Sequence, residues 1–439
     1  MPSSAPPGPR PRIPRSVLAW ATFLLFAVAA VAAIGVGNPL HEMRVQRGRT
    51  ALAVLCTVAG LICASALLIR PSLARPKRVA CFSLAFSLLC ALGTLFTWIA
   101  VGTGHTLEDV PGTPVSTKEQ VRAELTAKGR EGLQPIPTGV LVETMEFTNS
   151  HNVRLTGYVW QTLPADAADT EHPHLDLPDA VDGGVTTTRT YRAKRDDQQV
   201  VGWQLRATLR QSFDYGNFPL DKQTVGLTMR PRSARVVLVP DFYAYPSWQP
   251  GKKYGLYQDL VSGEWHTEYT TYSLDMAHEA TNYGRPAVSI GGGVPELSFV
   301  VGVSRPFLSP LLHYLVPLLV IAFLVFGSLF VITVDPDRRT VSGFSTWAVI
   351  SFCGSMLLVV SVQLSSLYDA TGSSGIVYAE YFYFIQYVVI SLVCLDVIEH
   401  TSPRLNRIID WRGNAVARLL YWPVYSTLLL LATVGVLLL

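Results

Sequence analysis

Charged residues are scarce in this chain. They make up 15% of its 439 residues, whereas a typical soluble protein has about 25%. The scarcity is uneven: residues 102–305 carry 19 Lys/Arg and 24 Asp/Glu, a net charge of −5, and the remainder carries 16 and 8, a net charge of +8. This split excludes an ordinary cytosolic enzyme, a disordered chain and a basic nucleic-acid binder. It indicates a membrane protein with one large water-exposed domain.

Cysteine is missing from the polar part of the chain. All six cysteines lie in apolar runs, at Cys56, Cys63, Cys81, Cys90, Cys353 and Cys394. The polar part therefore has no disulfide framework and no thiolate zinc site, and we expect no metal ion or cofactor. The patterns H-E-x-x-H and G-x-S-x-G and the P-loop are absent as well, so the sequence predicts that the protein is not an enzyme.

Long apolar runs, in contrast, are abundant. A membrane-spanning helix needs about 20 apolar residues, and seven stretches qualify: 17–36, 51–69, 79–101, 311–334, 341–364, 377–399 and 417–439. Their grouping predicts a three-span region over 1–104, a water-exposed domain over 105–305 and a four-helix region over 306–439. A cleaved signal peptide is the alternative for the first stretch, although its apolar run exceeds the usual length of about 7–15 residues.

The basic residues orient these spans. With the N-terminus inside, the inside segments carry thirteen Lys/Arg and the short outside segments carry three, Arg44, Arg47 and Arg49. Cytoplasmic loops carry the excess of Lys/Arg. We therefore expect a multi-pass protein of the plasma (inner) membrane, with a cytoplasmic N-terminus and with residues 105–305 and the C-terminus outside.

The water-exposed domain has the pattern of a β-structure. The run Ser116-Thr117-Lys118-Glu119 resembles a capping box and predicts one short helix over 117–129. Strands are then predicted at 140–147, 153–160, 186–191, 200–210, 224–229, 234–239, 264–272 and 296–303. Their spacing is typical of an antiparallel sandwich, and 163–185 is predicted to be an exposed loop. The expected fold class is an α+β membrane protein, with an extracellular antiparallel β-sandwich between a three-helix and a four-helix transmembrane region.

Two stretches and the order of the segments carry a family resemblance. The first stretch is Phe218-Pro219-Leu220-Asp221-Lys222-Gln223, and the second is strand 296–303 followed by Arg305 and an apolar helix that contains Pro317. With the β-domain and the four spans, they resemble the pentameric ligand-gated ion channel (Cys-loop receptor) family, in its bacterial, cysteine-less form, over about 130–439. The resemblance implies a homopentamer in a lipid bilayer, gated by an unknown small extracellular ligand, and no nucleic-acid partner.

The resemblance also suggests a gating interface. It implies that Phe218, Pro219, Asp221 and Arg305 couple the motion of the ligand domain to the helices. An aromatic-Pro pair in a tight loop favours a cis peptide bond. A carboxylate and a guanidinium at a water-poor boundary form a strong charge-assisted hydrogen bond. The alternative is a purely structural turn followed by an interfacial arginine. The first 105 residues have no counterpart in the family plan and are a candidate collar around the ring.

Segment 341–364 is the candidate pore helix. It is the most polar of the last four spans, and such residues face protein or water rather than lipid. Helical spacing places on one stripe Val341, Ser345, Ala348, Phe352, Ser355 and Val359. If Arg339 aligns with the family's basic residue at the inner pore mouth, this stripe faces the pore. Its serines would then contact water, and Phe352 and Val359 would form an apolar constriction that closes the pore by excluding water. Close helix packing by small residues is the alternative.

Ion selectivity depends on charges near the ends of that helix. Asp335 and Asp337 favour cations, whereas Arg338 and Arg339 beside them favour anions. With Asp369 near the outer end, the balance is slightly in favour of cations.

The ligand site is expected among aromatic residues, because aromatic faces attract cations and stack on rings. The resemblance places it between adjacent subunits. The candidates are Tyr243, Tyr245, Trp248, Tyr269, Tyr272 and Tyr283. In contrast, Trp160, Trp203 and Trp265 fall within or beside predicted strands and are expected in the core.

Two other functions remain open at this point. One is a non-conducting receptor that signals to a partner through its three N-terminal spans. The other is a transporter, although the three-plus-four arrangement lacks the paired, interrupted halves that many transporters show.

Overall fold

The computed structural model describes residues 76–102, 110–165, 171–246, 252–261, 265–277, 293–332, 345–372, 375–399 and 414–438. The chain divides into two compact units. The helical unit comprises 1–104, 310–368 and 376–439, and the β unit comprises 105–309 and 369–375. The predicted spans 17–36 and 51–69 lie outside the described residues.

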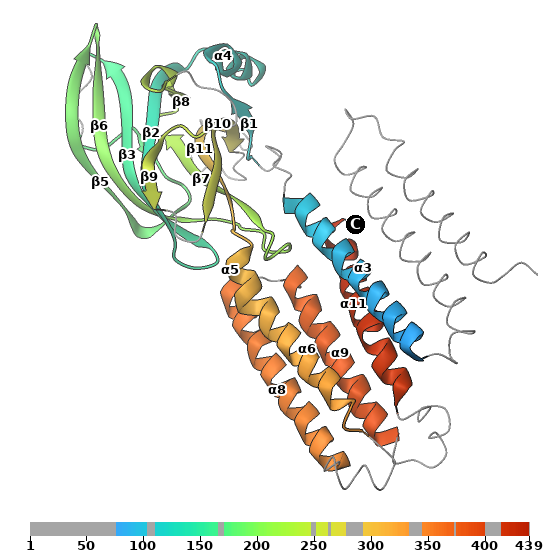
Figure 1. Ribbon diagram of the computed structural model, residues 1–439. Helices are drawn as coiled ribbons and strands as arrows, with labels where there is room; N and C mark the ends of the chain where they lie inside the picture. The colour runs from blue at the N-terminus through green and yellow to red at the C-terminus, as the bar shows by residue number, and fades with distance from the viewer. Residues whose placement is uncertain are drawn as a thin grey trace, which may run out of the picture. The chain divides into compact units, whose positions relative to one another are not determined.

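The described residues of the β unit form two sheets (Figure 1). The first has five strands in the order β1 (Thr113–Val115), β10 (His266–Ala277), β11 (Val294–Ser304), β7 (Lys222–Pro231) and β4 (Leu175–Asp176). The second has six in the order β5 (Ala180–Arg195), β6 (Gln198–Arg210), β3 (Asn152–Pro164), β2 (Gln134–Phe147) and β8 (Val236–Pro240), with β9 (Leu256–Val261) also paired to β2. Each of the eight predicted strands is present.

The second sheet is mixed, so the expectation of purely antiparallel pairing is wrong there. Strand β2 pairs in parallel with both β8 and β9, whereas β2, β3, β6 and β5 pair antiparallel in turn. The physical reason is connectivity. A tight hairpin forces antiparallel pairing, but β2 and β8 are joined through five intervening strands, and a long connection permits either direction.

The predicted loop 163–185 also needs correction. Its first two residues end β3, Leu175 and Asp176 form β4, and β5 begins at Ala180. The Asp, Ala and Pro composition suggested a loop, but backbone pairing with β7 and β6 gives its second half regular structure.

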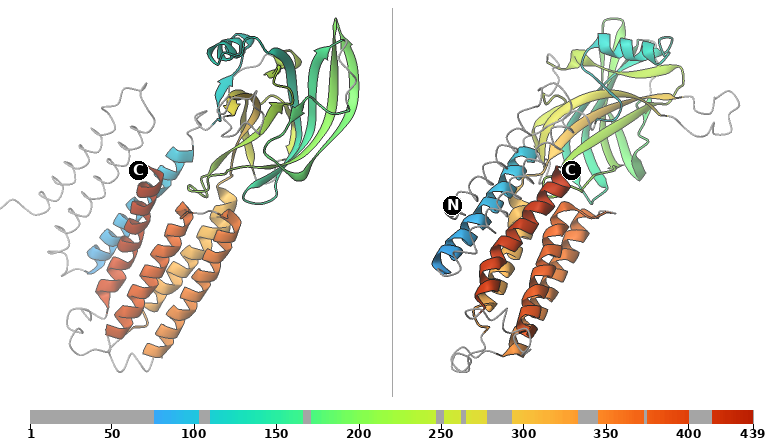
Figure 2. Two further views of the ribbon diagram at one scale, coloured as in Figure 1. Left: turned by 180° about the vertical axis from the view of Figure 1, so that it is seen from behind. Right: turned by 90° about the vertical axis from the view of Figure 1, so that its right-hand side faces the viewer.

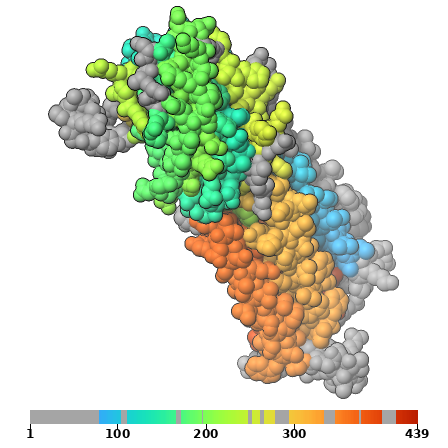
Figure 3. Space-filling model, turned by 90° about the vertical axis from the view of Figure 1, so that its left-hand side faces the viewer, coloured from blue at the N-terminus to red at the C-terminus, as the bar shows by residue number. Residues whose placement is uncertain are grey.

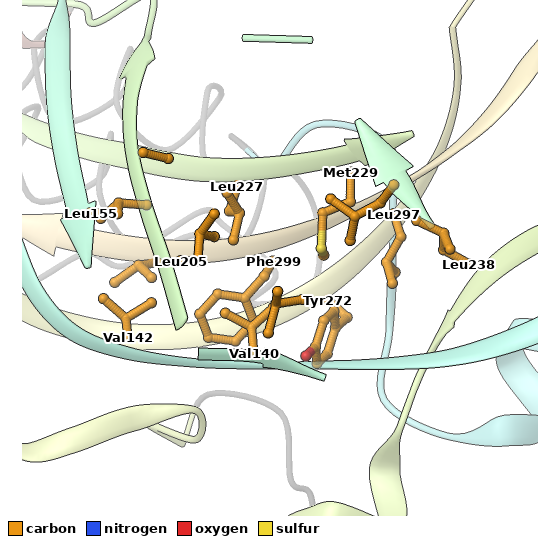
Figure 4. Packing of buried hydrophobic residues seen from close by; sticks show 14 of the residues in the cluster. Val140, Val142, Leu155, Leu205, Leu227, Met229, Leu238, Tyr272, Leu297 and Phe299 are labelled. Carbon is orange, nitrogen blue, oxygen red and sulfur yellow. The ribbon is translucent and has the colours of Figure 1, made fainter. Parts of the chain in front are cut away.

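One hydrophobic cluster joins the two sheets. Strand β6 shows why: Val201, Trp203, Leu205, Ala207 and Leu209 are buried at every second position, because successive side chains of a strand point to opposite faces. Figure 4 shows members of this cluster from the first sheet, including Leu227, Leu297 and Phe299, packed against members from the second, including Val140, Leu155 and Leu205. Trp203 and Trp265 are buried as expected, and Trp160 is half-buried.

The predicted short helix is α4 (Lys118–Ala127), and its cap differs by one residue from the expected one. The N-cap is Thr117, whose side chain accepts a hydrogen bond from the Gln120 backbone N–H. Gln120 Oε1 in turn accepts from the Ser116 N–H at 2.8 Å. Glutamine therefore takes the place that the sequence pattern assigned to Glu119.

Among the described residues, five helices are long and apolar enough to cross a membrane. They are α3 (Pro76–Gly102), the run α5 (Leu308–Pro310), η3 (Leu311–Leu315) and α6 (Val316–Ser328), then α8 (Thr346–Thr371), α9 (Tyr378–Glu399) and α11 (Ala415–Leu437). Helices α3 and α11 lie side by side in every ribbon view (Figures 1 and 2). Segment η3 is a π-helical turn just before Pro317, and a proline removes a helical N–H donor and favours such irregularity.

Helix α8 extends farther than the sequence predicted. The span was expected to end at 364, with Ser365, Ser366, Leu367 and Tyr368 following it, but all four lie inside the helix. None of them is a helix breaker. Gly372, the first residue after the helix, has a φ of +54°, which favours glycine and ends the helix.

Candidate functional site

The predicted pair of Asp221 and Arg305 is formed. Arg305 Nε donates to Asp221 Oδ1 at 3.1 Å, and the Asp221 side chain is 0% exposed, against 14% for Arg305. The Arg305 backbone N–H also approaches the Asp221 carbonyl oxygen, at 3.4 Å. Asp221 precedes β7 and Arg305 follows β11, two strands that pair directly. Removing one partner of a buried ion pair typically costs about 3–5 kcal/mol, so this contact fixes the end of β11 to the loop before β7.

Each motif residue of that loop has a structural task. The Phe218–Pro219 peptide bond is cis, as expected, and Phe218 is buried. Gln223 holds the backbone of Asp214 from both sides: its Nε2 donates to the Asp214 carbonyl at 2.6 Å, and its Oε1 accepts from the Asp214 N–H at 3.1 Å. The same Nε2 lies 3.3 Å from Asp221 Oδ2. The glutamine thus holds the carboxylate in place for Arg305.

Aromatic rings enclose the guanidinium. Arg305 Cζ lies 4.3 Å from the centroid of the Trp265 ring and 5.2 Å from that of Phe218. The Trp265 ring stacks on Phe147, with centroids 4.6 Å apart. A cation between aromatic faces and one buried carboxylate gains cation–π attraction in addition to the ion pair. The sequence pattern did not reveal the role of Trp265, because 39 residues separate it from Arg305 and only the pairing of β10 with β11 brings them together.

The turn between β2 and β3 belongs to the same site. The Tyr215 hydroxyl donates to the Ser150 carbonyl at 3.2 Å. Burial of Tyr215, reinforced by the Asp221 charge, raises the pKa of its phenol to about 12, so the hydroxyl stays protonated and remains a donor. Segment 369–375, which begins with the last three residues of α8, is part of the β unit. Gly372 approaches Ser150 so closely that a Cβ there would overlap the serine hydroxyl. The site therefore connects the β-strands to the residues after α8.

Four of the six predicted pore residues are exposed, three on α8 and Ser345 directly before it. Ser345, Ala348, Ser355 and Val359 are exposed, Phe352 is half-buried, and Val341 lies outside the described residues. The charges Asp335, Asp337, Arg338 and Arg339 lie outside them too, whereas Asp369 is described and exposed.

The most exposed face of α8 does not coincide with the predicted stripe but is rotated from it about the helix axis. Val349, Cys353, Val360 and Leu367 are buried. Directly opposite lie Ser351, Ser355, Leu358 and Val362, all exposed. At 3.6 residues per turn, the centre of this face is about 70° from that of the predicted stripe. The exposed face and the predicted stripe share Ser355. Figure 3 shows α8 (deep orange) along one surface of the helical unit.

The serine side chains of α8 present hydrogen-bond acceptors to their surroundings. Ser355 donates its hydroxyl proton to the Ser351 carbonyl at 3.0 Å, and Ser361 and Ser365 bond in the same way to the carbonyls four residues before them. Because these protons are engaged within the helix, the oxygen lone pairs of Ser355 and Ser365 remain free to accept. The Ser361 oxygen already accepts from the Tyr387 hydroxyl at 2.9 Å. Such a surface suits water molecules and cations better than anions.

The ligand candidates divide into core and surface residues. Tyr272 is fully buried, and its hydroxyl lies 2.8 Å from that of Tyr245, which also bonds the Val140 backbone. Tyr269 is buried beside Val110 and Val300. Among the described candidates, Tyr243 alone is exposed, at 71%, with Lys118 Nζ 3.2 Å from its ring centroid. Trp248 and Tyr283 lie outside the described residues. This packing assigns Tyr245, Tyr269 and Tyr272 to the interior, a role that their sequence context did not reveal.

Comparison with known proteins adds no family to this picture. No family model and no curated protein matches the chain. The family resemblance therefore depends on the residues of the Asp221–Arg305 junction and on the order of the segments.

Proposed function

We propose that this chain is one subunit of a homo-oligomeric, ligand-gated ion channel, with the two sheets arranged as an extracellular β-sandwich and α8 lining the pore. The observation that carries the proposal is the buried Asp221–Arg305 pair. It ties the motif loop to the residue that leads from the last strand into the first helix of the C-terminal group. A rigid connection at that position is what transmission of a ligand signal to the helices requires.

The exposed face of α8 supports a conducting path. Of the five candidate spans, α8 is the least buried within its own chain, and the exposed side carries serines. The exposed polar face of such a span needs contact with water or with further copies of the chain. A ring of identical subunits provides neighbouring copies and a central water-filled path. The free acceptor lone pairs of Ser355 and Ser365 favour cations. The proposed assembly is a pentamer, as the family resemblance implies.

The direction of α3 and α11 supports the proposed topology. The two helices pack in parallel, since Ser83 bonds Leu419 and Cys90 lies beside Thr427. They must then cross a membrane in the same direction. This agrees with a cytoplasmic N-terminus, an external β unit and an external C-terminus in the plasma (inner) membrane.

Two measurements test the proposal. Native mass spectrometry of the purified full-length protein in detergent should show a homo-oligomer, with five copies expected. Planar-bilayer recording should show single-channel currents that appear or change when small extracellular compounds are screened. A monomer would contradict the ring. A stable oligomer that carries no current with any compound would favour the non-conducting receptor, for which the close packing of α3 on α11 provides a signalling route.

Surface labelling tests the orientation. We expect a cysteine in place of Val185, a β5 residue that is 40% exposed, to react with a membrane-impermeant maleimide in intact cells. The background should have the native cysteines replaced by alanine. The matched control is Ser345→Cys, directly before α8 and on the inner side in the proposed topology, which should be labelled only after permeabilisation if the pore is closed. Labelling of the Val185→Cys variant only after lysis would contradict the proposed orientation.

A further inference from the structure

Helix α3 belongs to the N-terminal region that the proposed channel plan does not require, yet it packs along the whole of α11. Ser83 donates to the Leu419 carbonyl at 2.6 Å, and Cys90 Sγ lies 3.9 Å from Thr427 Oγ1. One turn farther, a Cβ on Gly93 would come within 3.2 Å of Leu430 Cδ1. The partners keep a nearly constant separation of 336 or 337 residues in sequence, so the two helices stay in register.

The contact face of α3 is made for close approach. It presents small or hydroxyl-bearing residues at helical spacing: Ser83, Ser87, Cys90, Gly93, Thr94 and Thr97. Such residues let two membrane helices pack with their backbones near each other. Phe86 and Cys90 form one buried cluster with Leu430 and Val434 of α11 and with its C-cap residue, Leu438. The opposite side of α3 is apolar and exposed, with Leu84 and Phe96 at 69% and 60%.

The last turns of α3 reach a third helix. Trp98 Nε1 donates to the Tyr378 hydroxyl at 2.7 Å, and that hydroxyl lies 2.7 Å from Thr433 Oγ1 of α11. Tyr378 and Thr433 are both fully buried. The Trp98 ring also lies 6.3 Å from that of Phe382, one turn along α9. In an apolar setting, these hydrogen bonds have no water to replace them when they break.

Tyr378 is the first residue of α9, and it follows directly on the segment after α8. We infer that α3 is a built-in regulatory helix, locked on α11, whose Trp98 holds the first turn of α9 through Tyr378. The N-terminal region thereby sets the position of the start of α9. This inference rests on the proposed function only where it concerns gating, because the contact itself is independent of conduction.

Amide hydrogen exchange of the full-length protein tests the contact. Trp98→Phe removes the donor and keeps an aromatic ring, and Tyr378→Phe removes the hydroxyl that both partners use. One hydrogen bond of ordinary net strength corresponds to about a threefold to tenfold change in a local opening equilibrium. Trp98→Phe should therefore accelerate exchange in peptides covering 376–382 by about that factor, and Tyr378→Phe, which removes both hydrogen bonds of the hydroxyl, by at least as much. The double variant should exchange no faster than Tyr378→Phe alone, because that change already removes the Trp98 bond.

The matched control is Tyr381→Phe, which removes a hydroxyl on the same turn of α9 outside this chain of hydrogen bonds. It should leave the exchange of 376–382 unchanged. Unchanged exchange in Trp98→Phe, equal acceleration in Tyr381→Phe, or effects that multiply in the double variant would each overturn the inference.

Current recording on the same variants separates the inference from the proposed function. Trp98→Phe should shift the single-channel open probability recorded with no compound added, and Tyr381→Phe should not. If the wild-type protein carries no current but the exchange pattern is found, the channel proposal fails and the α3 contact stands. If currents are normal and neither exchange nor gating responds to Trp98→Phe, the channel stands and the regulatory helix is wrong.

Discussion

Replacing Asp221 by asparagine is expected to impair gating and to destabilise the β unit by about 3 kcal/mol, the lower end of the range for breaking a buried ion pair. The Asp221 side chain is 0% exposed, so water cannot replace the lost carboxylate beside Arg305. Arg305→Gln should have a similar effect. Arg305→Lys should only partly restore function, because an ammonium group cannot both stack flat on Trp265 and bond the carboxylate as a guanidinium does. Thermal unfolding and ligand concentration–response curves measure the two effects.

A double-mutant cycle shows whether the two residues act together. If they do, the combination of Asp221→Asn with Arg305→Gln should cost at least about 1 kcal/mol less than the sum of the single changes, both in stability and in gating. Strict additivity would contradict a direct coupling.

Another ion pair of the same sheet provides the matched control. Arg230 on β7 and Glu296 on β11 lie 2.6 Å apart, with side chains 26% and 12% exposed. They pair across the same two strands but away from the motif loop. Arg230→Gln should lower the unfolding temperature and leave the gating midpoint unchanged. An equal gating shift from this pair would mean that general destabilisation, not the Asp221–Arg305 junction, explains the result.

Replacing Leu358 by serine should raise the resting conductance severalfold. Leu358 is 67% exposed, and Val362, one turn away on the same face, is 63% exposed. In a ring of α8 helices, these side chains form an apolar constriction that excludes water, and a hydroxyl makes it easier to hydrate. Steady-state current without ligand is the measurement. Val320→Ser on α6, a valine that is 51% exposed, is the control for a polar residue placed elsewhere on the helical unit, and it should leave the resting current unchanged.

The same experiment decides between the two faces of α8. Phe352→Ser tests the stripe predicted from the sequence, and Leu358→Ser tests the face that packing leaves most exposed. A larger resting current in Phe352→Ser than in Leu358→Ser would restore the predicted stripe. If neither variant conducts more than the wild type, α8 does not contain the constriction.

Local sequence patterns were sufficient wherever the physical cause is local. Alternation of apolar residues over a few positions placed β6 and its neighbours, since the period of two is a property of the strand itself. Runs of about 20 apolar residues located the five described spans because helix length and bilayer thickness fix that number. The run from Phe218 to Gln223 indicated both its cis bond and, with the basic residue after the last strand, the pairing of Asp221 with Arg305.

Tertiary structure alone decided which neighbours each residue meets across long separations. A periodicity shows that a helix has faces but not which face the rest of the chain covers, so the buried row from Val349 to Leu367 appeared only once α8 was packed. Tyr272 looked like a binding aromatic until the two sheets closed over it. Trp265 beneath Arg305 and Trp98 beside Tyr378 are joined by contacts between elements far apart in sequence. Such contacts depend on how whole elements pack, and no short window of sequence contains that information.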